Sequence, residues 1–220
     1  MAVVVFDLDG TLIDSAPDIR AAVNKMLGEQ GIDPLDLPTI VSFIGNGLPK
    51  LVERVIQHTG LDMARHEELT AVTLAHYNVA TTALTRLYPG VLHALQDLQA
   101  KEHILAICTN KPEAPARAIL RDLGIEHFFN GVIGGDTLPV KKPDPEPLLY
   151  ILRHLGQGPV VYVGDSEIDA ETAQRAGIYF ALFTKGYRKT PVEKIPHQAQ
   201  FDAFQRLPEL VDAACGSALG

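Results

Sequence analysis

Two carboxylates separated by a single residue, Asp7 and Asp9, follow directly on an apolar run near the start of the chain. The run Val3–Phe6 is rich in β-branched residues, and Gly10 comes after the acids, which predicts a short buried strand that leads into a turn. Alternate residues of a strand point to the same side, so the two carboxylates should lie a few ångströms apart. Their repulsion is costly unless a shared proton or a cation relieves it, and a divalent metal is the simplest candidate.

Two simpler interpretations of this Asp-x-Asp-Gly pattern are a turn with solvated acids and a fragment of a calcium-binding loop. An EF-hand loop needs further oxygen ligands at regular positions and a closing Glu at its twelfth position. Ile13, Ala16 and Ile19 do not form such a series. The calcium loop is therefore disfavoured, whereas the solvated turn stays open on these residues alone.

Composition and charge restrict the possible partners. The 220-residue chain has 46% hydrophobic residues and a formal net charge of −8, so it can bury a core but is poorly suited to nucleic acid or an anionic membrane. A phosphate-bearing small molecule would need a local positive group. No apolar run reaches the roughly 18 residues of a membrane span, and no basic and apolar leader opens the chain, which predicts a cytoplasmic protein. Cys108 and Cys215 show no pairing pattern and predict free thiols, with Cys108 packed in the core.

The elements that must position the acids follow from the spacing of apolar residues. Ser15 and Pro17 are typical of a helix start, and apolar residues at helical spacing continue to about residue 85, which predicts a small helical bundle. After Gly90, continuous apolar runs alternate with helical patterns. We expect strands at 103–110, 131–135, 160–165 and 179–183, and helices at 91–101, 114–123, 146–155, 167–176 and 207–215. Residues 185–200, with several prolines and charges, predict a surface loop.

This alternation predicts an α/β fold, a Rossmannoid parallel sheet with helices on both faces. Residues 1–14 and 85–220 form the predicted core, and residues 15–84 form a small α-helical cap inserted after the first strand. Ligands of such sheets bind beyond the carboxyl ends of the strands. Asp7 and Asp9 should therefore meet the polar residues that follow two later strands, with the cap as a lid over them: Thr109, Asn110 and Asp165.

Lys142 is the candidate positive group for this site. It lies in a proline-rich run in which Pro143 and Pro145 stiffen the backbone, and Lys141 is the alternative. Both lysines could instead be solvated surface residues. Simpler interpretations also exist for the other strand-end groups, because Thr109 and Asn110 could form only a turn, and Asp165-Ser166 could only cap the following helix.

The chemistry that these groups allow is displacement at phosphorus. A carboxylate nucleophile is poorly suited to carbon esters, but an aspartyl-phosphate divides one difficult phosphoryl transfer into two easier steps. A metal and a lysine would neutralise charge on the phosphoryl oxygens. We assign the attack to Asp7, which begins the turn at the strand end, and the acid–base role to Asp9, although their spacing alone does not establish that order.

Four ordered motifs resemble those of the haloacid dehalogenase-like hydrolases. They are Asp7-Leu8-Asp9-Gly10-Thr11-Leu12, Ile107-Cys108-Thr109-Asn110, Lys142-Pro143 and Gly164-Asp165-Ser166-Glu167-Ile168-Asp169. The resemblance spans essentially the whole chain. It implies a Rossmannoid core with a helical cap inserted after the first strand, Mg²⁺ as cofactor, and phosphatase chemistry through an aspartyl-phosphate.

The resemblance also implies a role for each matching residue. Asp7 would be the nucleophile and a metal ligand, and Asp9 would be the acid–base residue that also gives the metal its backbone carbonyl. Asp165 would complete the metal ligands. The phosphoryl group would be held by Thr109, Asn110 and Lys142. Three residues would support this site from just outside it: Thr11, Ser166 and Asp169. Asp169 matches an acid that ligates the metal in some relatives and lies outside the ligand shell in others.

A second segment of interest lies in the helical block, where Gly45 and Gly47 flank Asn46. Two glycines allow backbone conformations closed to other residues, so the segment is either a helix connector or a loop that dips toward the strand ends. It resembles the Gly-Asn-Gly and Leu-Val-Glu-Arg signature of the phosphoglycolate phosphatase branch. That implies 2-phosphoglycolate as the substrate, with its carboxylate received by backbone N–H groups of residues 45–47 or by Lys50 or Arg54.

The leading hypothesis is Mg²⁺-dependent hydrolysis of a small phosphomonoester, 2-phosphoglycolate first. Alternatives within the same fold are a phosphatase for a sugar phosphate, a nucleotide or pyrophosphate, a phosphomutase, and a phosphonate hydrolase, which would need a cap amine such as Lys25 or Lys50. A non-catalytic phosphate-sensing module is disfavoured because Asp7 and Asp9 are both present. A dinucleotide enzyme is disfavoured because no Gly-x-Gly-x-x-Gly follows a strand. The assembly, monomer or homodimer, stays open.

Overall fold

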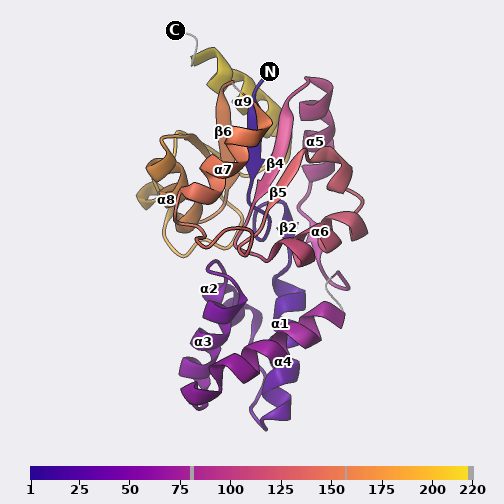
Figure 1. Ribbon diagram of the computed structural model, residues 1–220, viewed down its shortest axis with the longest axis vertical. Coiled ribbons are helices and arrows are strands. Elements are labelled where there is room, and N and C mark those ends of the chain that lie inside the picture. The colour runs from indigo at the N-terminus through magenta and orange to yellow at the C-terminus, as the bar shows by residue number, and fades with distance from the viewer. Residues whose placement is uncertain (80–81, 157, 218–220) are drawn as a thin grey trace.

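A six-stranded sheet forms the centre of the computed structural model, which describes residues 1–220 except 80–81, 157 and 218–220 (Figure 1). The strand order is β5-β4-β1-β6-β7-β8, and neighbouring strands pair in parallel throughout. The first strand, β1 (Val3–Phe6), lies between β4 (Ile104–Cys108) and β6 (Val160–Gly164). The other strands are β5 (Gly131–Ile133), β7 (Tyr179–Phe183) and β8 (Ala199–Phe201). Strand order therefore reverses around β1, where a ligand site is expected.

Helices cover both faces of this sheet because its strands are apolar on both sides. Val4 and Phe6 belong to a buried cluster with residues of α5 (Val91–Ala100), α6 (Glu113–Asp122) and α9 (Leu207–Ser217). Val3 and Val5 belong to the opposite cluster, with residues of α7 (Glu146–Leu155) and α8 (Glu167–Ala176). Alternate side chains along β1 thus pack into two separate cores, one on each face of the sheet. The prediction of an α/β fold with helices on both faces is confirmed.

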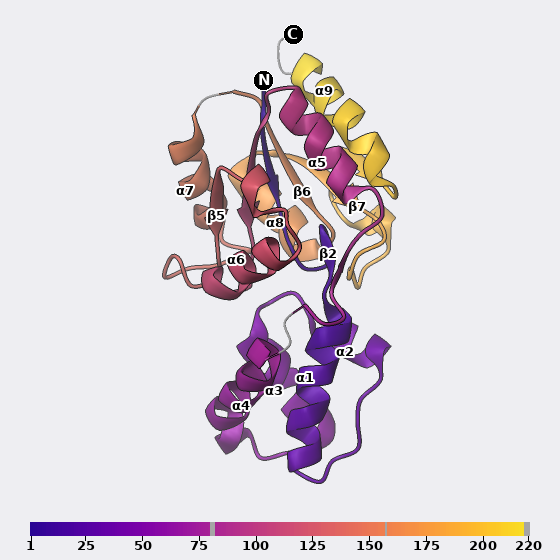
Figure 2. The same ribbon diagram turned by 90° about the vertical axis from the view of Figure 1, so that its right-hand side faces the viewer.

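Four helices of the described chain pack together beyond the carboxyl ends of the strands (Figures 1 and 2). They are α1 (Ala16–Glu29), α2 (Leu37–Phe43), α3 (Leu48–Thr59) and α4 (His66–Val79). Apolar positions at helical spacing form their shared interior, as in α3, where the buried residues are Leu51, Val52, Val55 and Ile56. Residues 80–81, which belong to the predicted cap, lie outside the described residues.

The two chain crossings between the sheet and the helices lie side by side. β2 (Ile13–Asp14) pairs antiparallel with β3 (Arg86–Leu87). The buried Asp18 carboxylate then accepts hydrogen bonds from Leu84 N at 3.0 Å, and from Thr85 N and Thr85 Oγ1 at 2.7 Å each. The sequence pattern did not indicate this small ribbon, because strands of two residues have no measurable alternation.

The remaining elements are short. One-turn 3-10 helices lie at Met63–Arg65, Glu126–Phe128, Val192–Lys194 and Phe204–Arg206. The expectation of a surface loop over 185–200 is wrong at its end, because β8 begins at Ala199 and pairs with β7. This strand is too short for its pattern to stand out. No helix in the described part of the chain is long and apolar enough to cross a membrane.

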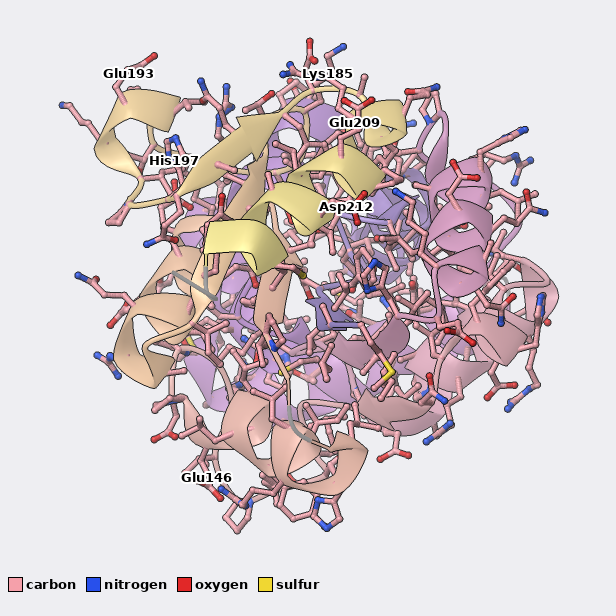
Figure 3. All side chains as sticks on the ribbon, turned by 90° about the horizontal axis from the view of Figure 1, so that it is seen from above. Glu146, Lys185, Glu193, His197, Glu209 and Asp212 are labelled. Atoms are coloured by element: carbon pink, nitrogen blue, oxygen red, sulfur yellow. The ribbon has the colours of Figure 1, made fainter. Side chains whose placement is uncertain are left out.

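Charged side chains gather on the outside of the molecule. Seen from the end opposite the four-helix group, Lys185, Glu193 and Glu209 point outward (Figure 3), and all three are exposed. On α9, Asp212 pairs with Lys101 at 2.5 Å. The buried charges of this chain are instead concentrated where the strands meet the four-helix group.

Candidate active site

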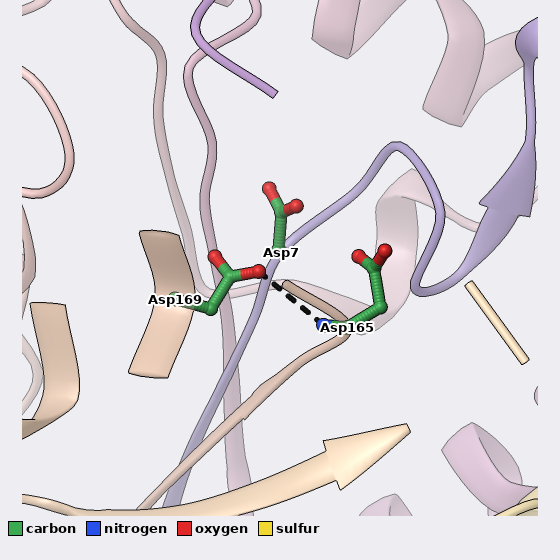
Figure 4. Close-up of side chains that lie close together, drawn as sticks. All are labelled: Asp7, Asp165 and Asp169. Carbon is green, nitrogen blue, oxygen red and sulfur yellow. Dashed lines mark hydrogen bonds between the residues drawn. The ribbon is translucent and has the colours of Figure 1, made fainter. Parts of the chain in front are cut away.

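Three buried carboxylates meet at the carboxyl ends of the two central strands (Figure 4). Asp7 follows β1, Asp165 follows β6, and Asp169 lies in the first turn of α8. One carboxylate oxygen of each lies within 4.8 Å of the others. Because β1 and β6 are parallel neighbours, the fold itself brings together acids that are more than 150 residues apart in the sequence.

The electrostatics of this cluster favour a cation. Burial raises the pKa of Asp7 to about 6, although the Lys142 ammonium opposes that rise. Burial, together with the charges of Asp169 and Asp7, raises the pKa of Asp165 well above its usual range. Raised carboxyl pKa values mean that the ionised forms are unfavourable as they stand. A bound divalent cation would stabilise those ionised forms.

Lys142 connects the cluster to the neighbouring loop. Its buried ammonium lies 2.9 Å from Asp7 Oδ1 and donates hydrogen bonds to Asp169 Oδ1 at 2.7 Å and Tyr162 Oη at 2.9 Å. Asp7 Oδ1 has no aligned hydrogen-bond donor among the described residues. Burial alone would lower the pKa of Lys142, but the carboxylates of Asp169 and Asp7 raise it, so the side chain stays a cation. The sequence did not single out Tyr162, which lies within an apolar strand.

Asp169 is fully occupied by the protein. Besides Lys142 and Tyr162 on Oδ1, its Oδ2 accepts hydrogen bonds from Ser166 Oγ at 2.6 Å and Ser166 N at 3.1 Å. Ser166 and Asp169 form the reciprocal cap of α8, as the simpler interpretation of this motif expected. Burial alone would raise the pKa of Asp169, but the Lys142 charge and these hydrogen bonds hold it below its usual value.

Asp165 is held in place by two donors and two glycines. Thr11 Oγ1 donates to its Oδ1 at 2.7 Å, and Tyr187 N donates to its Oδ2 at 2.6 Å. A Cβ on Gly186 would stand 2.3 Å from Asp165 Cβ, and one on Gly10, where φ is +89°, would stand 2.6 Å from Asp165 Oδ2. Only glycine fits at either position. The sequence analysis did not identify Tyr187, whose hydroxyl donates to Asp14 Oδ1 and accepts from Ala16 N, the first residue of α1.

Asp9 lies apart from this cluster, against a lysine that the sequence analysis missed. Lys111 Nζ donates to both of its carboxylate oxygens, at 2.9 and 3.0 Å, and Ser15 Oγ donates at 2.5 Å. The Lys111 side chain is only 7% exposed. Burial alone would lower its pKa, but Asp9 raises it, so Lys111 stays charged. Its position directly after Thr109 and Asn110, at a strand end, was the available signal.

Thr109 and Asn110 follow β4 and face the same site. Thr109 is buried, and its hydroxyl accepts a hydrogen bond from Lys111 N at 3.3 Å. Asn110 Nδ2 donates to Lys142 O at 2.9 Å and to Gly45 O at 3.1 Å. Asn110 therefore ties the lysine loop and the loop of the four-helix group to one strand end.

The Gly45–Gly47 loop is fastened rather than free. Gly45 and Gly47 adopt φ values of +123° and +85°, which glycine tolerates best. Lys141 Nζ donates to Asn46 O at 3.0 Å. Arg54 donates to Phe43 O at 2.6 Å and to Asn46 Oδ1 at 2.7 Å, so it holds the shape of the loop. Lys50 pairs with Glu53 at 2.6 Å on the exposed side of α3.

A single pocket joins these groups. Its lower wall consists of the strand-end carboxylates, Lys111 and Lys142, and its upper wall comes from the four-helix group. The lining residues of that upper wall are mostly apolar and include Ile19, Ala22, Leu51, Leu74 and Tyr77. A ligand there would be enclosed between the sheet and the helices, with the lysines that line the pocket on the sheet side.

The family model described as haloacid dehalogenase-like hydrolase matches residues 4–183. The chain belongs to this family. The match includes most of β1, the four-helix group and each of the strand-end acids. The resemblance that the four motifs indicated is thereby confirmed.

Several relatives of this haloacid dehalogenase-like hydrolase are named phosphoglycolate phosphatases, the branch that the Gly45–Gly47 segment resembles. A phosphoglycolate phosphatase of Cereibacter sphaeroides is 50% identical over 94% of this chain and 96% of its own length. One of Rhodobacter capsulatus is 45% identical over 94% of this chain and 95% of its own length. A crystal structure of a predicted phosphoglycolate phosphatase from Haemophilus somnus superimposes with a TM-score of 0.90 at 31% identity, covering 95% of this chain and 97% of that one. The predicted enzyme class, a phosphoric monoester hydrolase, is confirmed.

Proposed function

We propose that this hydrolase converts 2-phosphoglycolate to glycolate and phosphate, with Asp7 as the nucleophile. The observation that carries the proposal is the buried Asp7 carboxylate beside the Lys142 ammonium, at the base of a pocket closed by the four-helix group. The substrate is proposed because phosphoglycolate phosphatases 45–50% identical to this chain align over nearly its whole length.

Mg²⁺ is the proposed cofactor, and the residues present fit it. Asp7 and Asp165 would hold it together with the backbone carbonyl of Asp9, since hard oxygen ligands suit this ion. Asp169 would not contribute, because both of its oxygens are already occupied by hydrogen bonds. When bound, Mg²⁺ would neutralise charge on the carboxylates and on the phosphoryl oxygens.

The chain's own residues would carry the reaction in two steps. Asp7 attacks phosphorus and the bond from phosphorus to the leaving oxygen breaks, while Asp9 protonates that oxygen. Asp9 then takes a proton from water, which attacks the same phosphorus and releases Asp7. Lys142, the Thr109 hydroxyl and the backbone N–H of Asn110 would hold the phosphoryl group during both transfers, since the Asn110 side-chain amide already donates to Lys142 O and Gly45 O. Thr11, Ser166 and Asp169 keep the acids and Lys142 in place through the contacts described above.

The helical segment 15–84 would act as a cap domain on a core of residues 1–14 and 85–220. Its Gly45–Gly47 loop lines the pocket, and Asn46 and Arg54 shape that loop. Closure over the strand ends would exclude water from the first transfer. Cytoplasmic location and a monomeric or homodimeric assembly complete the proposal.

The test is a kinetic panel of phosphorylated metabolites with Mg²⁺, ranked by kcat/KM, which measures discrimination. We expect 2-phosphoglycolate to rank above sugar phosphates, nucleotides and pyrophosphate. Chelation of the metal or Asp7→Asn should reduce the rate to background, whereas the exposed Asp33→Asn removes the same charge and should not. A higher rank for another class would refute the substrate, and full activity of Asp7→Asn would refute the mechanism.

The aspartyl-phosphate can be tested separately with p-nitrophenyl phosphate. Its leaving group needs no proton, so Asp9→Asn should still be phosphorylated but should hydrolyse slowly. We expect a burst of p-nitrophenolate close to one equivalent, which leaves about one equivalent of phosphate on the protein as an acyl-phosphate that hydroxylamine removes. No burst, together with multiple turnovers in Asp9→Asn, would contradict a covalent intermediate.

A further inference from the structure

The binding group for the carboxylate of the substrate differs from those expected from the sequence. Arg54 is engaged with two oxygens of its own loop, and Lys50 pairs with Glu53 at the surface. Among the described residues, the cations that line the pocket are Lys111, Lys142 and Lys189. Lys142 belongs to the phosphoryl side through Asp7 and Asp169. The choice is therefore between Lys111 and Lys189.

The chemistry of the substrate favours Lys111. In 2-phosphoglycolate a single CH₂ separates the leaving oxygen from the carboxyl carbon, so the carboxylate must lie within a few ångströms of the group that protonates that oxygen. That group is Asp9, and the cation in contact with Asp9 is Lys111, at 2.9 and 3.0 Å. Without a cation at this place, the carboxylate of the leaving glycolate would face the Asp9 carboxylate unscreened once Asp9 has given up its proton.

The number of hydrogen-bond donors on Lys111 and its burial also suit it to binding a carboxylate. An ammonium has three N–H donors, and the two Asp9 oxygens accept from it, so one donor remains beside the Tyr77 ring. The side chain is 7% exposed and is already desolvated by the fold, so binding a carboxylate requires little further loss of water. Lys189, by contrast, lies exposed at the edge of the pocket.

A second donor lies beside Lys111 on the opposite wall. Tyr77 of α4 is buried and lines the pocket, yet its hydroxyl has no hydrogen-bond partner among the described residues. Lys111 Nζ lies 4.8 Å from the centre of its ring, over the face, and is not aligned with the hydroxyl. An unpaired buried hydroxyl is costly, and a ligand oxygen would satisfy it.

We propose that Lys111 Nζ and Tyr77 Oη together bind the carboxylate of the substrate, one donor to each oxygen. Lys111 follows β4 in the sheet and Tyr77 belongs to the four-helix group, so the carboxylate links the two walls of the pocket. This inference rests on the proposed function, because it assigns the determinant of specificity for the same reaction. Apart from Tyr77, the upper wall is largely apolar, which would discriminate against polyhydroxylated sugar phosphates.

The experiment compares 2-phosphoglycolate with its neutral amide, 2-phosphoglycolamide, in the full-length protein with Mg²⁺. The readout is the ratio of kcat/KM for the acid to that for the amide, because effects on Asp9 or on phosphoryl transfer cancel in it. We expect Lys111→Met to lower the ratio about 10- to 100-fold, as for loss of a charged hydrogen bond. Tyr77→Phe should lower it about 3- to 10-fold. Lys185→Met, a surface charge control, should leave it unchanged.

The outcomes separate this inference from the proposed function. If the unmodified protein shows no preference for the acid over the amide, the proposed substrate fails. If it shows the preference and both Lys111→Met and Tyr77→Phe retain it, only the assignment of these two residues fails. A larger loss in Lys189→Met than in Lys111→Met would also overturn it. Tyr77→Phe removes a hydroxyl with no internal partner, so it should fold even where Lys111→Met does not.

Discussion

The Asp169→Asn substitution tests whether this acid positions Lys142 or ligates the metal. Asp169 Oδ1 accepts from Lys142 at 2.7 Å and from Tyr162 at 2.9 Å, while Oδ2 accepts from the Ser166 hydroxyl and backbone. An amide can keep only one acceptor, so its NH₂ must face either the ammonium or the two Ser166 donors. A charged hydrogen bond contributes about 1.5–3 kcal/mol, and an unsatisfied buried donor costs about 1–3 kcal/mol.

These magnitudes predict a specific kinetic pattern. We expect Asp169→Asn to lose about 2–4 kcal/mol of folding stability and about 10- to 100-fold in kcat, because Lys142 loses its orientation. The Mg²⁺ concentration for half-maximal rate should stay within about 3-fold, whereas Asp165→Asn should raise it more than about 10-fold. Glu171→Gln, on the exposed side of α8, is the control for the same helix and charge change.

The assay is a Mg²⁺ titration of initial rates, with a urea unfolding curve for each variant. The reasoning would be refuted if Asp169→Asn raised the Mg²⁺ requirement as much as Asp165→Asn does. It would also be refuted if kcat were unaffected, since Lys142 would then not depend on this carboxylate for its position.

Three further predictions concern other parts of the molecule. Asp18→Asn should lower the free energy of unfolding in urea by about 2–4 kcal/mol, because its carboxylate accepts from three donors of Leu84 and Thr85. The exposed Asp33→Asn should change this free energy by less than about 0.5 kcal/mol. Equal effects of the two substitutions would contradict a stabilising role for the Asp18 contacts. Gly186→Ala should lower the thermal midpoint of unfolding and kcat together, since the added Cβ would stand 2.3 Å from Asp165 Cβ. An unchanged circular dichroism melt would show that the backbone at residue 186 can move away from Asp165. Burial raises the pKa of Cys108 to about 12, so a disulfide reagent at pH 8 should modify it only in denaturant; rapid labelling of both thiols in the native protein would contradict this.

Much of the fold could be predicted because its buried strands are continuous apolar runs. β1, β4, β6 and β7 were expected within a few residues of their bounds, and the helices after β4 and β6 each end close to a glycine, Gly124 and Gly177. The short pieces were not predictable in this way. β2, β3 and β8 contain two or three residues each, and their pairing depends on neighbours distant in the sequence.

The candidate site divides along the same line. The sequence by itself determined which acids follow strands, and the topology of a parallel sheet then required Asp7 and Asp165 to meet. Only the tertiary structure decided what each carboxylate touches. Asp9 is held by Lys111, and Asp169 by Tyr162 and Lys142. Such contacts have no local signature, because periodicity reports the burial of a residue and not its partner across the fold.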